Sequence, residues 1–210
     1  MMQHAVIYDC EFMTNEEGFK RSFCGPYDPE PTVVQIGAVK IALTDGLPIV
    51  DKKTVYIIPR SRRGERLALG SYFINLTGIT EQDIDDHGVS LKTALNTLDK
   101  FSEGCTLWAW GHDERNMIAL SCFVENIPMP IPSTRFDNAA CILLKAGMPL
   151  EDILKTNSGR LAAYYDLEDA KDIQEHDGLS DALSITYAMQ HLNKRGQLEA
   201  EWLLNPTYFV

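Results

Sequence analysis

Acidic residues at the ends of expected strands are the part of this sequence best able to do chemistry. Asp9 and Glu11 form a D-x-E pair directly after a short apolar run, Ala5–Tyr8, which reads as a buried strand. Alternation along a strand puts both carboxylates on one face. Carboxylates that close repel each other and raise a pKa unless a cation lies between them. Because D-x-E occurs three times in the chain, a solvated strand end remains the alternative.

Asp113 is a second acid at the junction of two expected elements. It follows the apolar segment Thr106–Trp110 and precedes a helix expected from about Glu114 to Val124. Sites in open α/β sheets lie outside the carboxyl ends of the strands. An Asp at this position is also a common helix N-cap, so both interpretations stay open.

His176 and Asp181 stand four residues apart in the segment HDGLSD, and Asp181 lies at the start of a helix expected over Ser180–Leu192. Gly178 lets the chain bend before that helix, so His176 can reach over a site that Asp181 enters. The alternative is a capping Asp beside an exposed His.

Taken together, these residues predict a site for divalent cations. Carboxylates at Asp9, Glu11, Asp113 and Asp181 offer the hard oxygen ligands that Mg²⁺ and Mn²⁺ prefer. Two such ions close together hold both the attacking and the leaving oxygen of a phosphodiester. A neutral histidine, here His176, is a suitable base for the attacking water. We therefore expect two divalent cations, Mg²⁺ or Mn²⁺, as cofactors.

The elements that position these residues predict one α/β domain over residues 1–210. Strands with short links come first, and strands then alternate with helices. This order predicts a five-stranded mixed sheet, three antiparallel strands followed by parallel strands, flanked by helices. The expected strands are Ala5–Tyr8, Val33–Leu43, Thr54–Ile58, Thr106–Trp110 and Arg135–Asp137. The expected helices are Ser90–Phe101, Glu114–Val124, Ala139–Leu144, Leu161–Tyr165, Ser180–Leu192 and Leu198–Leu204.

Composition and charge exclude several classes of protein. The 210 residues are 45% hydrophobic and 23% charged, which is ordinary for a globular protein and unlike disordered, collagen-like or disulfide-scaffold chains. A net charge of −11 argues against electrostatic coating of long duplex DNA. It does not argue against a protein whose carboxylates hold cations.

The same features bear on location. No apolar run approaches the roughly 18 residues of a membrane span, and the N-terminal segment lacks the basic start of a signal peptide. The five cysteines, Cys24 among them, are odd in number and include no C-x-x-C pair. Reduced thiols in a cytoplasmic protein without a membrane partner are therefore expected.

As an ordered set, the motifs resemble the DEDDh branch of the 3′–5′ exonucleases, which have a ribonuclease H-like fold. The motifs are DCE at Asp9 to Glu11, WGHD ending at Asp113, and HDGLSDA with His176 and Asp181. The second is similar to the WGxxD variant of enhanced-RNAi-type exoribonucleases. The segments VVQIGAVKI and YFINLTGIT between the motifs also resemble the family.

The resemblance implies a role for each site residue. Asp9 would bridge two metal ions, Glu11 and Asp181 would complete the first ion, and Asp113 would hold the second. His176 would accept the proton of the attacking water. The resemblance alone implies release of nucleoside 5′-monophosphates from a 3′ end, and a homodimer is a family-level expectation.

Two segments are expected to hold the substrate. Arg62 and Arg63 belong to the loop RSRRGER, which carries four of the 19 basic residues and is either a phosphate-contacting loop or a solvated one. Phe12, Leu76 and Ile79 form an apolar slot for the last base. A core role for Leu76 and Ile79 is the alternative.

These observations predict a metal-dependent 3′–5′ exonuclease acting on single-stranded 3′ ends or short oligonucleotides. A small-nucleotide phosphodiesterase of the oligoribonuclease type is the alternative enzyme. A catalytically inactive nucleic-acid-binding module is the alternative outside enzymes, although such a module has no need of four acids and a histidine. RNA and DNA are not distinguished, because recognition of the 2′-OH depends on pocket shape.

Overall fold

A five-stranded mixed sheet is the centre of the computed structural model, which describes residues 3–23 and 25–206. The sheet order is β3-β2-β1-β4-β5; β1–β2 and β2–β3 pair antiparallel, and β1–β4 and β4–β5 pair parallel. The predicted α/β fold and its strand directions are therefore confirmed. The strands are β1 (His4–Phe12), β2 (Val33–Ala42), β3 (Ile49–Tyr56), β4 (Leu107–Ala109) and β5 (Phe136–Asn138).

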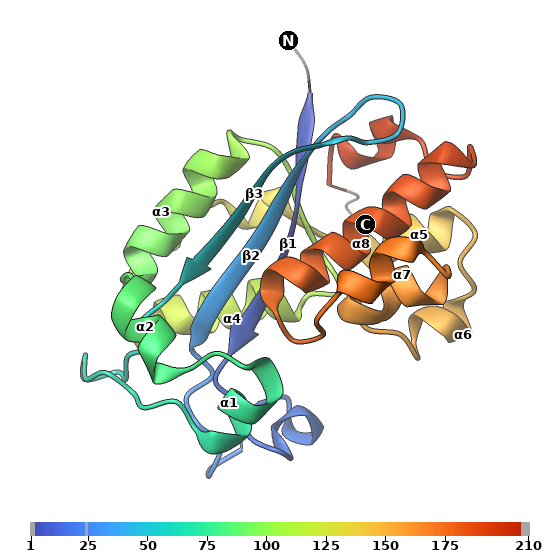
Figure 1. Ribbon diagram of the computed structural model, residues 1–210. Helices are drawn as coiled ribbons and strands as arrows, with labels where there is room; N and C mark the ends of the chain where they lie inside the picture. Colours follow the sequence, from blue (N-terminus) through green and yellow to red (C-terminus); the bar gives the residue numbers. More distant parts are fainter. Residues whose placement is uncertain (1–2, 24, 207–210) are drawn as a thin grey trace.

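Helices cover both faces of this sheet (Figure 1). Helices α3 and α4 share one buried cluster with the sheet, and α5, α7 and α8 share another on the opposite face. The α-helices are α1 (Ser71–Thr77), α2 (Glu81–His87), α3 (Leu91–Ser102), α4 (Asp113–Val124), α5 (Ala139–Lys145), α6 (Leu150–Ile153), α7 (Leu161–Tyr164) and α8 (Gly178–Lys194). The 3-10 turns are η1 (Gly18–Arg21), η2 (Ser133–Arg135), η3 (Ser158–Arg160), η4 (Glu168–Asp172) and η5 (Ala200–Leu203).

Strand β1 is buried on both faces, which explains its nearly continuous apolar run. Ile7 belongs to the cluster with α8, whereas Val6 and Tyr8 belong to the cluster with α3 and α4. The strand runs four residues past its predicted end at Tyr8, because pairing with β2 continues to Phe12. Asp9 and Glu11 therefore lie within the strand, and the polar carboxylates are held by the sheet itself.

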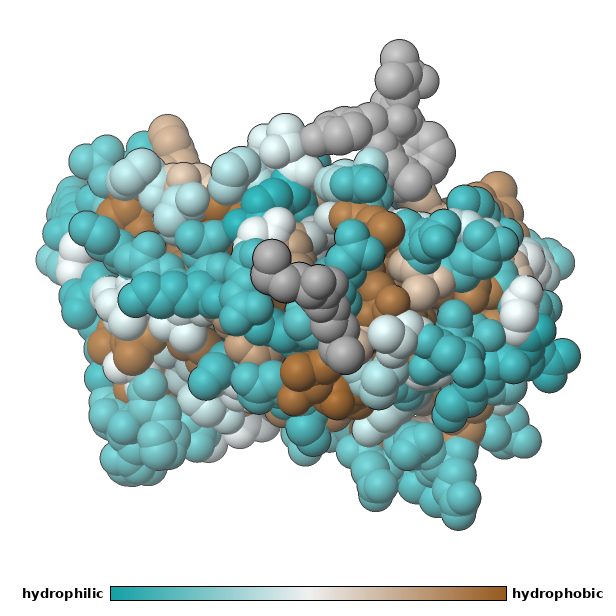
Figure 2. All heavy atoms as spheres, turned by 90° about the horizontal axis from the view of Figure 1, so that it is seen from above, coloured by the Kyte–Doolittle hydropathy of each residue, from teal (hydrophilic) through white to brown (hydrophobic). Residues whose placement is uncertain are grey.

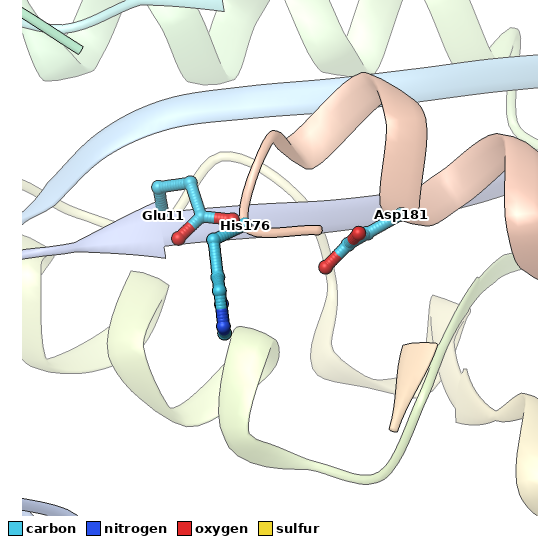
Figure 3. A group of neighbouring side chains, drawn as sticks. All are labelled: Glu11, His176 and Asp181. Carbon is cyan, nitrogen blue, oxygen red and sulfur yellow. The ribbon is translucent and has the colours of Figure 1, made fainter. Parts of the chain in front are cut away.

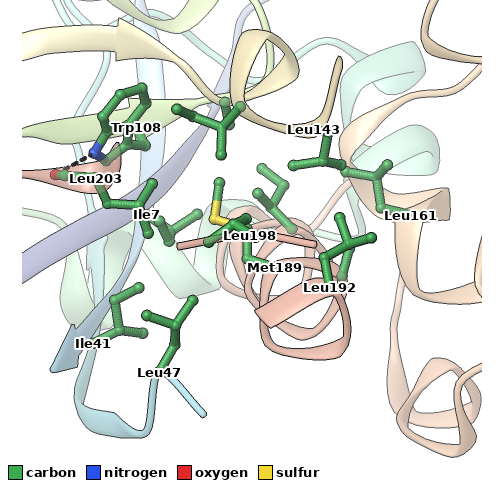
Figure 4. Close-up of a cluster of buried hydrophobic side chains, with 14 of the residues drawn as sticks. Ile7, Ile41, Leu47, Trp108, Leu143, Leu161, Met189, Leu192, Leu198 and Leu203 are labelled. Carbon is green, nitrogen blue, oxygen red and sulfur yellow. Dashed lines mark hydrogen bonds between the residues drawn. The ribbon is translucent and has the colours of Figure 1, made fainter. Parts of the chain in front are cut away.

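Helix α8 is packed against the sheet by the apolar cluster that it shares with α5 and α7 (Figure 4). Trp108 of β4 is fully buried in this cluster, and its indole Nε1 donates a hydrogen bond to the Leu203 carbonyl at 3.2 Å. Met189 and Leu192 from α8 pack in the same cluster. The position of α8 relative to β1 is thus fixed by apolar packing along most of its length.

Helices α1 and α2 were not expected from the sequence. Gly78 ends α1 in the left-handed conformation (φ 76°). Thr80 then begins α2 with a reciprocal capping box, in which its hydroxyl accepts from the Asp83 amide while the Asp83 carboxylate accepts from the Thr80 amide. The T-G-I-T segment is therefore a stop and start signal between two short helices, and these cover a third apolar cluster with Phe73 and Ile84.

The surface agrees with the composition. Seen from above, it is mostly hydrophilic, with hydrophobic residues exposed in separate small areas (Figure 2). Cys10, Cys105, Cys122 and Cys141 are free thiols, and Cys24 lies outside the described residues. Across the described ranges, the helices are all too short or too polar to cross a bilayer.

The start of α8 lies against β2 in direct backbone contact. A Cβ added at Gly37 of β2 would overlap the backbone of Gly178 and Leu179. A Cβ added at Gly178 would lie 3.1 Å from the Asp9 carbonyl oxygen. Glycine is required at Gly37, because the chain segments approach more closely there than any side chain allows, and the space at Gly178 is tight.

We predict that Gly37→Ala destabilises the protein, because its methyl group would overlap backbone that has nowhere to move. The expected loss is about 1–3 kcal/mol or more, which lowers the melting temperature by about 5 °C or more in a chain of this size. Thermal unfolding followed by circular dichroism measures it. Gly70→Ala is the matched control, since Gly70 has φ −68° and open space around its Cβ position; equal melting temperatures for both variants would contradict the prediction.

Candidate functional site

A cavity of about 360 Å³ opens where β1 ends, and acids from three elements line it. Asp9 and Glu11 come from β1, Glu114 comes from the first turn of α4, and Asp181 comes from the first turn of α8. His176 also lines the cavity. Residues far apart in the sequence are therefore brought together. They include Asp9, Glu11, His176 and Asp181 from the predicted set, with Glu114 in place of Asp113.

Glu11, His176 and Asp181 form the tightest group in this cavity. One ligand atom from each lies within 4.8 Å of those of the other two. Figure 3 shows Glu11 on β1 and Asp181 on α8, with His176 on the segment that leads into α8. An oxygen, nitrogen and oxygen set at this separation is suited to a divalent cation.

The first turn of α8 is held in place by the side chain of Gln35 on β2. Gln35 is fully buried; its Oε1 accepts from the Gly178 amide at 2.7 Å and its Nε2 donates to Asp177 Oδ2 at 3.0 Å. Asp177 in turn caps α8 by accepting from the Ser180 amide at 2.9 Å. Glu11 lies opposite Gln35 in the β1–β2 ladder. The register of the ladder therefore sets the position of Asp181 relative to the β1 acids.

The structure corrects two details expected for this turn. The bend lies at His176, whose φ of 64° is left-handed, and not at Gly178, which is the first residue of α8. Asp177 is the helix cap, so Asp181 is free of that role. A histidine with positive φ is uncommon, and such conformations persist where the surrounding structure imposes them, often at functional sites.

The structure does not bring Asp113 to the cavity; it brings Glu114. Asp113 is exposed at the first position of α4 and lines a separate cavity. Glu114 is only 8% exposed and lines the cavity with Asp9. The alternative role of Asp113 as N-cap is not observed either, because His112 occupies that position.

The motif itself contains a signal for Glu114. Counted from Trp110, the pattern WGxxD reaches position 114, where this chain has a glutamate in place of the aspartate.

The sequence did not identify Ser158, for a different reason. Its hydroxyl donates to Asp181 Oδ2 at 3.1 Å, but it lies in the short turn η3, which no sequence motif marks, so only the tertiary structure identifies it.

Burial and mutual repulsion raise the pKa of every acid in the cavity. Burial is the largest cause in each case. It raises the pKa of Asp9 well above its usual range, with Glu114 as the strongest charged neighbour. The pKa is raised to about 8 for Glu11 and Glu114 and to about 7 for Asp181. The Ser158 hydroxyl counteracts the shift at Asp9 and Asp181.

Two carboxylate oxygens in the cavity lack the hydrogen-bond partners that a bound cation could replace. Within the part of the chain that the structure describes, Glu114 Oε2 and Asp181 Oδ1 are buried without a hydrogen-bond partner. Buried polar atoms are nearly always partnered, so an orphaned pair of carboxylate oxygens calls for an explanation. A divalent cation supplies both the missing partner and the charge that repulsion among the acids demands.

The other side of the cavity is aromatic and apolar. Phe12 packs edge-on against Phe23, with ring centroids 4.8 Å apart. Leu76 and Tyr72 of α1 line the same cavity. Of the expected slot, Phe12 and Leu76 are thus at the site. Ile79 is not, since its side chain is 4% exposed and packs in the apolar cluster beneath α1 and α2.

The predicted basic loop lies away from this cavity, and its arginines differ in their contacts. Arg66 forms ion pairs with Glu81 and Asp85. The Arg62 guanidinium lies over the Phe123 ring, 4.6 Å from its centroid. Between residues 3 and 206, Cys24 excepted, no carboxylate forms an ion pair with Arg62 or Arg63.

We predict that raising the pH destabilises the metal-free protein. Glu11, Glu114 and Asp181 have higher pKa values in the folded protein than in an unfolded chain. The folded state therefore binds more protons between about pH 4.5 and 8, and its free energy of unfolding decreases as the pH rises through that window. Melting temperatures in EDTA should fall by at least about 3 °C between pH 5.5 and 8, and Mn²⁺ should restore them.

Glu114→Gln is the control for this measurement, because an amide stays neutral at every pH. Its melting temperature should decrease less than that of the parent protein over the same interval. Parallel curves for the two proteins in EDTA would count against the raised pKa of Glu114.

No protein-family model and no curated protein matches the sequence. Solved structures do match. A full-length 3′-exonuclease has a TM-score of 0.72 at 18% identity, over 94% of this chain and 62% of its own. The zinc-bound form of Escherichia coli exonuclease I with single-stranded DNA has a TM-score of 0.62 at 12% identity, over 94% and 41%. Exonuclease I from Methylocaldum szegediense has a TM-score of 0.62 at 13% identity, over 95% and 42%.

The chain therefore spans less than two thirds of the length of each of these exonucleases. The similarity nevertheless extends over nearly all of this chain and includes the mixed sheet with its helices. The chain has the fold of these exonucleases, which is the ribonuclease H-like fold that the motif resemblance predicted.

Proposed function

We propose that the protein is a metal-dependent 3′–5′ exonuclease of the DEDDh type, with residues 1–210 forming one exonuclease domain. It hydrolyses phosphodiester bonds at the 3′ end of single-stranded RNA or DNA and releases nucleoside 5′-monophosphates. The observation that supports this most strongly is the convergence of four buried acids and His176 in one cavity on an exonuclease fold.

Asp9, Glu11, Glu114 and Asp181 are the residues that would hold two divalent cations, Mg²⁺ or Mn²⁺. Glu114 replaces Asp113 in this set, because Glu114 is the acid of α4 that faces Asp9. Bound divalent cations supply Lewis acidity to the scissile phosphate and stabilise the charge that develops there. The unpartnered oxygens of Glu114 and Asp181 support this assignment.

His176 is proposed to accept the proton of the attacking water. Its side chain is partly exposed at the cavity and close to the Glu11 and Asp181 carboxylates. A partly exposed imidazole beside two carboxylates is placed to act as a general base and to pass the proton on to solvent. The backbone at His176 is left-handed, and its side chain lines the cavity just before α8 begins.

Phe12 and Leu76 are proposed to hold the terminal base, together with Phe23 and Tyr72. Aromatic and aliphatic side chains contact any base, so this wall implies little sequence preference. The cavity is small and the chain carries a net charge of −11. Both features favour a single flexible end over a long duplex, and E. coli exonuclease I, which shares the fold, was solved with single-stranded DNA.

The function is tested with matched RNA and DNA oligonucleotides that carry a 5′ label. Incubation with Mg²⁺ or Mn²⁺ should give a ladder of products shortened from the 3′ end, and EDTA should abolish it. Asp9→Asn, purified in the same way, is the control for contaminating nuclease. Equal cleavage by Asp9→Asn and the parent protein would reject the enzyme and favour an inactive binding module.

The neighbouring acids of α4 provide a matched pair of variants. Glu114→Gln should lower kcat/KM by about 100-fold or more, since loss of even an outer partner of a metal ligand typically costs 10–100-fold. Asp113→Asn should stay within about threefold of the parent, because its side chain is exposed outside the cavity. A larger loss of activity in Asp113→Asn than in Glu114→Gln would indicate that Asp113, and not Glu114, is the metal ligand.

Replacing the proposed base separates proton transfer from folding. His176→Asn retains a residue type that tolerates positive φ, yet removes the imidazole. We expect kcat to fall by about 100-fold or more, while the melting temperature changes little. Full activity of His176→Asn, measured as initial rates on a labelled single strand, would exclude His176 as the base.

A further inference from the structure

A second cavity, of about 330 Å³, adjoins the first along helix α4. Phe19 and Phe23 line both cavities, so the two share a wall built from the segment around η1. Phe19 is 63% exposed. The exposed Phe19 side chain therefore lies at the boundary between the acidic cavity and the cavity beside α4.

One face of α4 continues from this second cavity to an exposed aromatic ring. Asp113, Asn116 and Leu120 line the cavity and stand at positions i, i+3 and i+7 of the helix. Phe123 follows at i+10 and therefore lies on the same face. Its side chain is 66% exposed, although burial would be the ordinary fate of a phenylalanine in a helix that packs against a sheet.

Phe123 is also the point where the basic loop meets α4. The Arg62 guanidinium covers the ring from one side at 4.6 Å, which leaves the rest of the ring open to solvent. Arg62 and Arg63 form no ion pair within the described parts of the chain. In a protein of net charge −11, the Arg62 guanidinium beside an open aromatic ring, with Arg63 next to it in the chain, forms a local site for an anionic, stacking ligand.

We propose that the strand whose 3′ end occupies the first cavity runs along this face of α4 and stacks a base on Phe123, with Arg62 and Arg63 contacting its phosphates. This inference rests on the proposed exonuclease function. The bases, and not the phosphates, face α4 near its start, because the Asp113 carboxylate would repel phosphate there.

The length of α4 sets how much substrate this path takes. Nine residues separate Glu114 from Phe123, and a rise of 1.5 Å per residue makes that about 14 Å along the helix. Stacked nucleotides advance about 3.4 Å each, so Phe123 is reached by about the fifth nucleotide from the 3′ end, or earlier in an extended strand. A dinucleotide occupies the acidic cavity without reaching Phe123.

The test is the dependence of cleavage on substrate length. Steady-state kinetics with dinucleotides, tetranucleotides and octanucleotides of one sequence are compared for the parent and Phe123→Ala. Loss of base stacking should raise KM for the octanucleotide about fivefold or more, with the dinucleotide changed less than about twofold. Leu154→Ala is the matched control, since Leu154 is an exposed apolar side chain (77%) on the opposite sheet face, after α6.

A second variant tests the phosphate contacts independently of the aromatic ring. Arg62→Ser/Arg63→Ser should weaken octanucleotide binding and reduce the slope of log affinity against log salt by about 1–2, without changing dinucleotide cleavage. Neither substitution touches the acidic cavity, so metal-dependent hydrolysis itself should persist. Melting temperatures of all variants verify that the fold is retained.

The outcomes separate this inference from the proposed function. No cleavage by the parent protein at any length would reject the exonuclease. Cleavage by the parent, with losses in Phe123→Ala that are equal for dinucleotide and octanucleotide or absent for both, would reject the path along α4. A parent protein that gains nothing from length beyond a dinucleotide would also reject it and would favour the oligoribonuclease-type alternative.

Discussion

Repulsion among four buried carboxylates is the constraint on which the rest of the site depends. Asp9, Glu11, Glu114 and Asp181 come from three elements and converge where water is largely excluded. Burial alone would favour their neutral forms, and their proximity adds to that effect. The fold therefore has to hold this arrangement against an unfavourable free energy, and the surrounding structure is built to do so. A divalent cation converts the same proximity into a favourable interaction.

Three features of the fold hold the acids in place. Strand β1 is buried on both faces, and Asp9 and Glu11 lie opposite residues of β2 in the ladder, so the backbone that carries these two acids is fixed in the sheet. Backbone contact between Gly37 and the start of α8, reinforced by the Gln35 hydrogen bonds, fixes where Asp181 begins. The apolar cluster around Trp108 then holds the remainder of α8 to the sheet. Because the elements that carry the carboxylates are fixed in this way, the ligand atoms are preorganised for a cation.

The surroundings of the acids divide into regions with different chemistry. Carboxylates and His176 form one side of the first cavity, and aromatic and aliphatic side chains form the other. A nucleotide has an apolar, aromatic base and a charged phosphate, so a terminal nucleotide could place its base against the apolar side and its phosphate, through cations, against the acidic side. The second cavity and the open Phe123 ring extend the aromatic region along α4, while the acidic region stays confined to the end of β1. Under the proposed function, hydrolysis and strand holding would be separated in space.

The sequence by itself predicted the number and directions of the strands and the pairing of Asp9 with Glu11, because strand alternation and apolar runs are local properties. The third strand nevertheless begins at Ile49 and not at Thr54. The sequence also predicted that His176 and Asp181 lie near the β1 acids, and both line the same cavity. Only the tertiary structure decided between Asp113 and Glu114, and between Leu76 and Ile79. Successive residues of a helix point about 100° apart, so the residue that faces β1 depends on how the helix is packed, which no local pattern records. The same holds for the bend at His176, whose left-handed backbone directly precedes the close contact of α8 with β2.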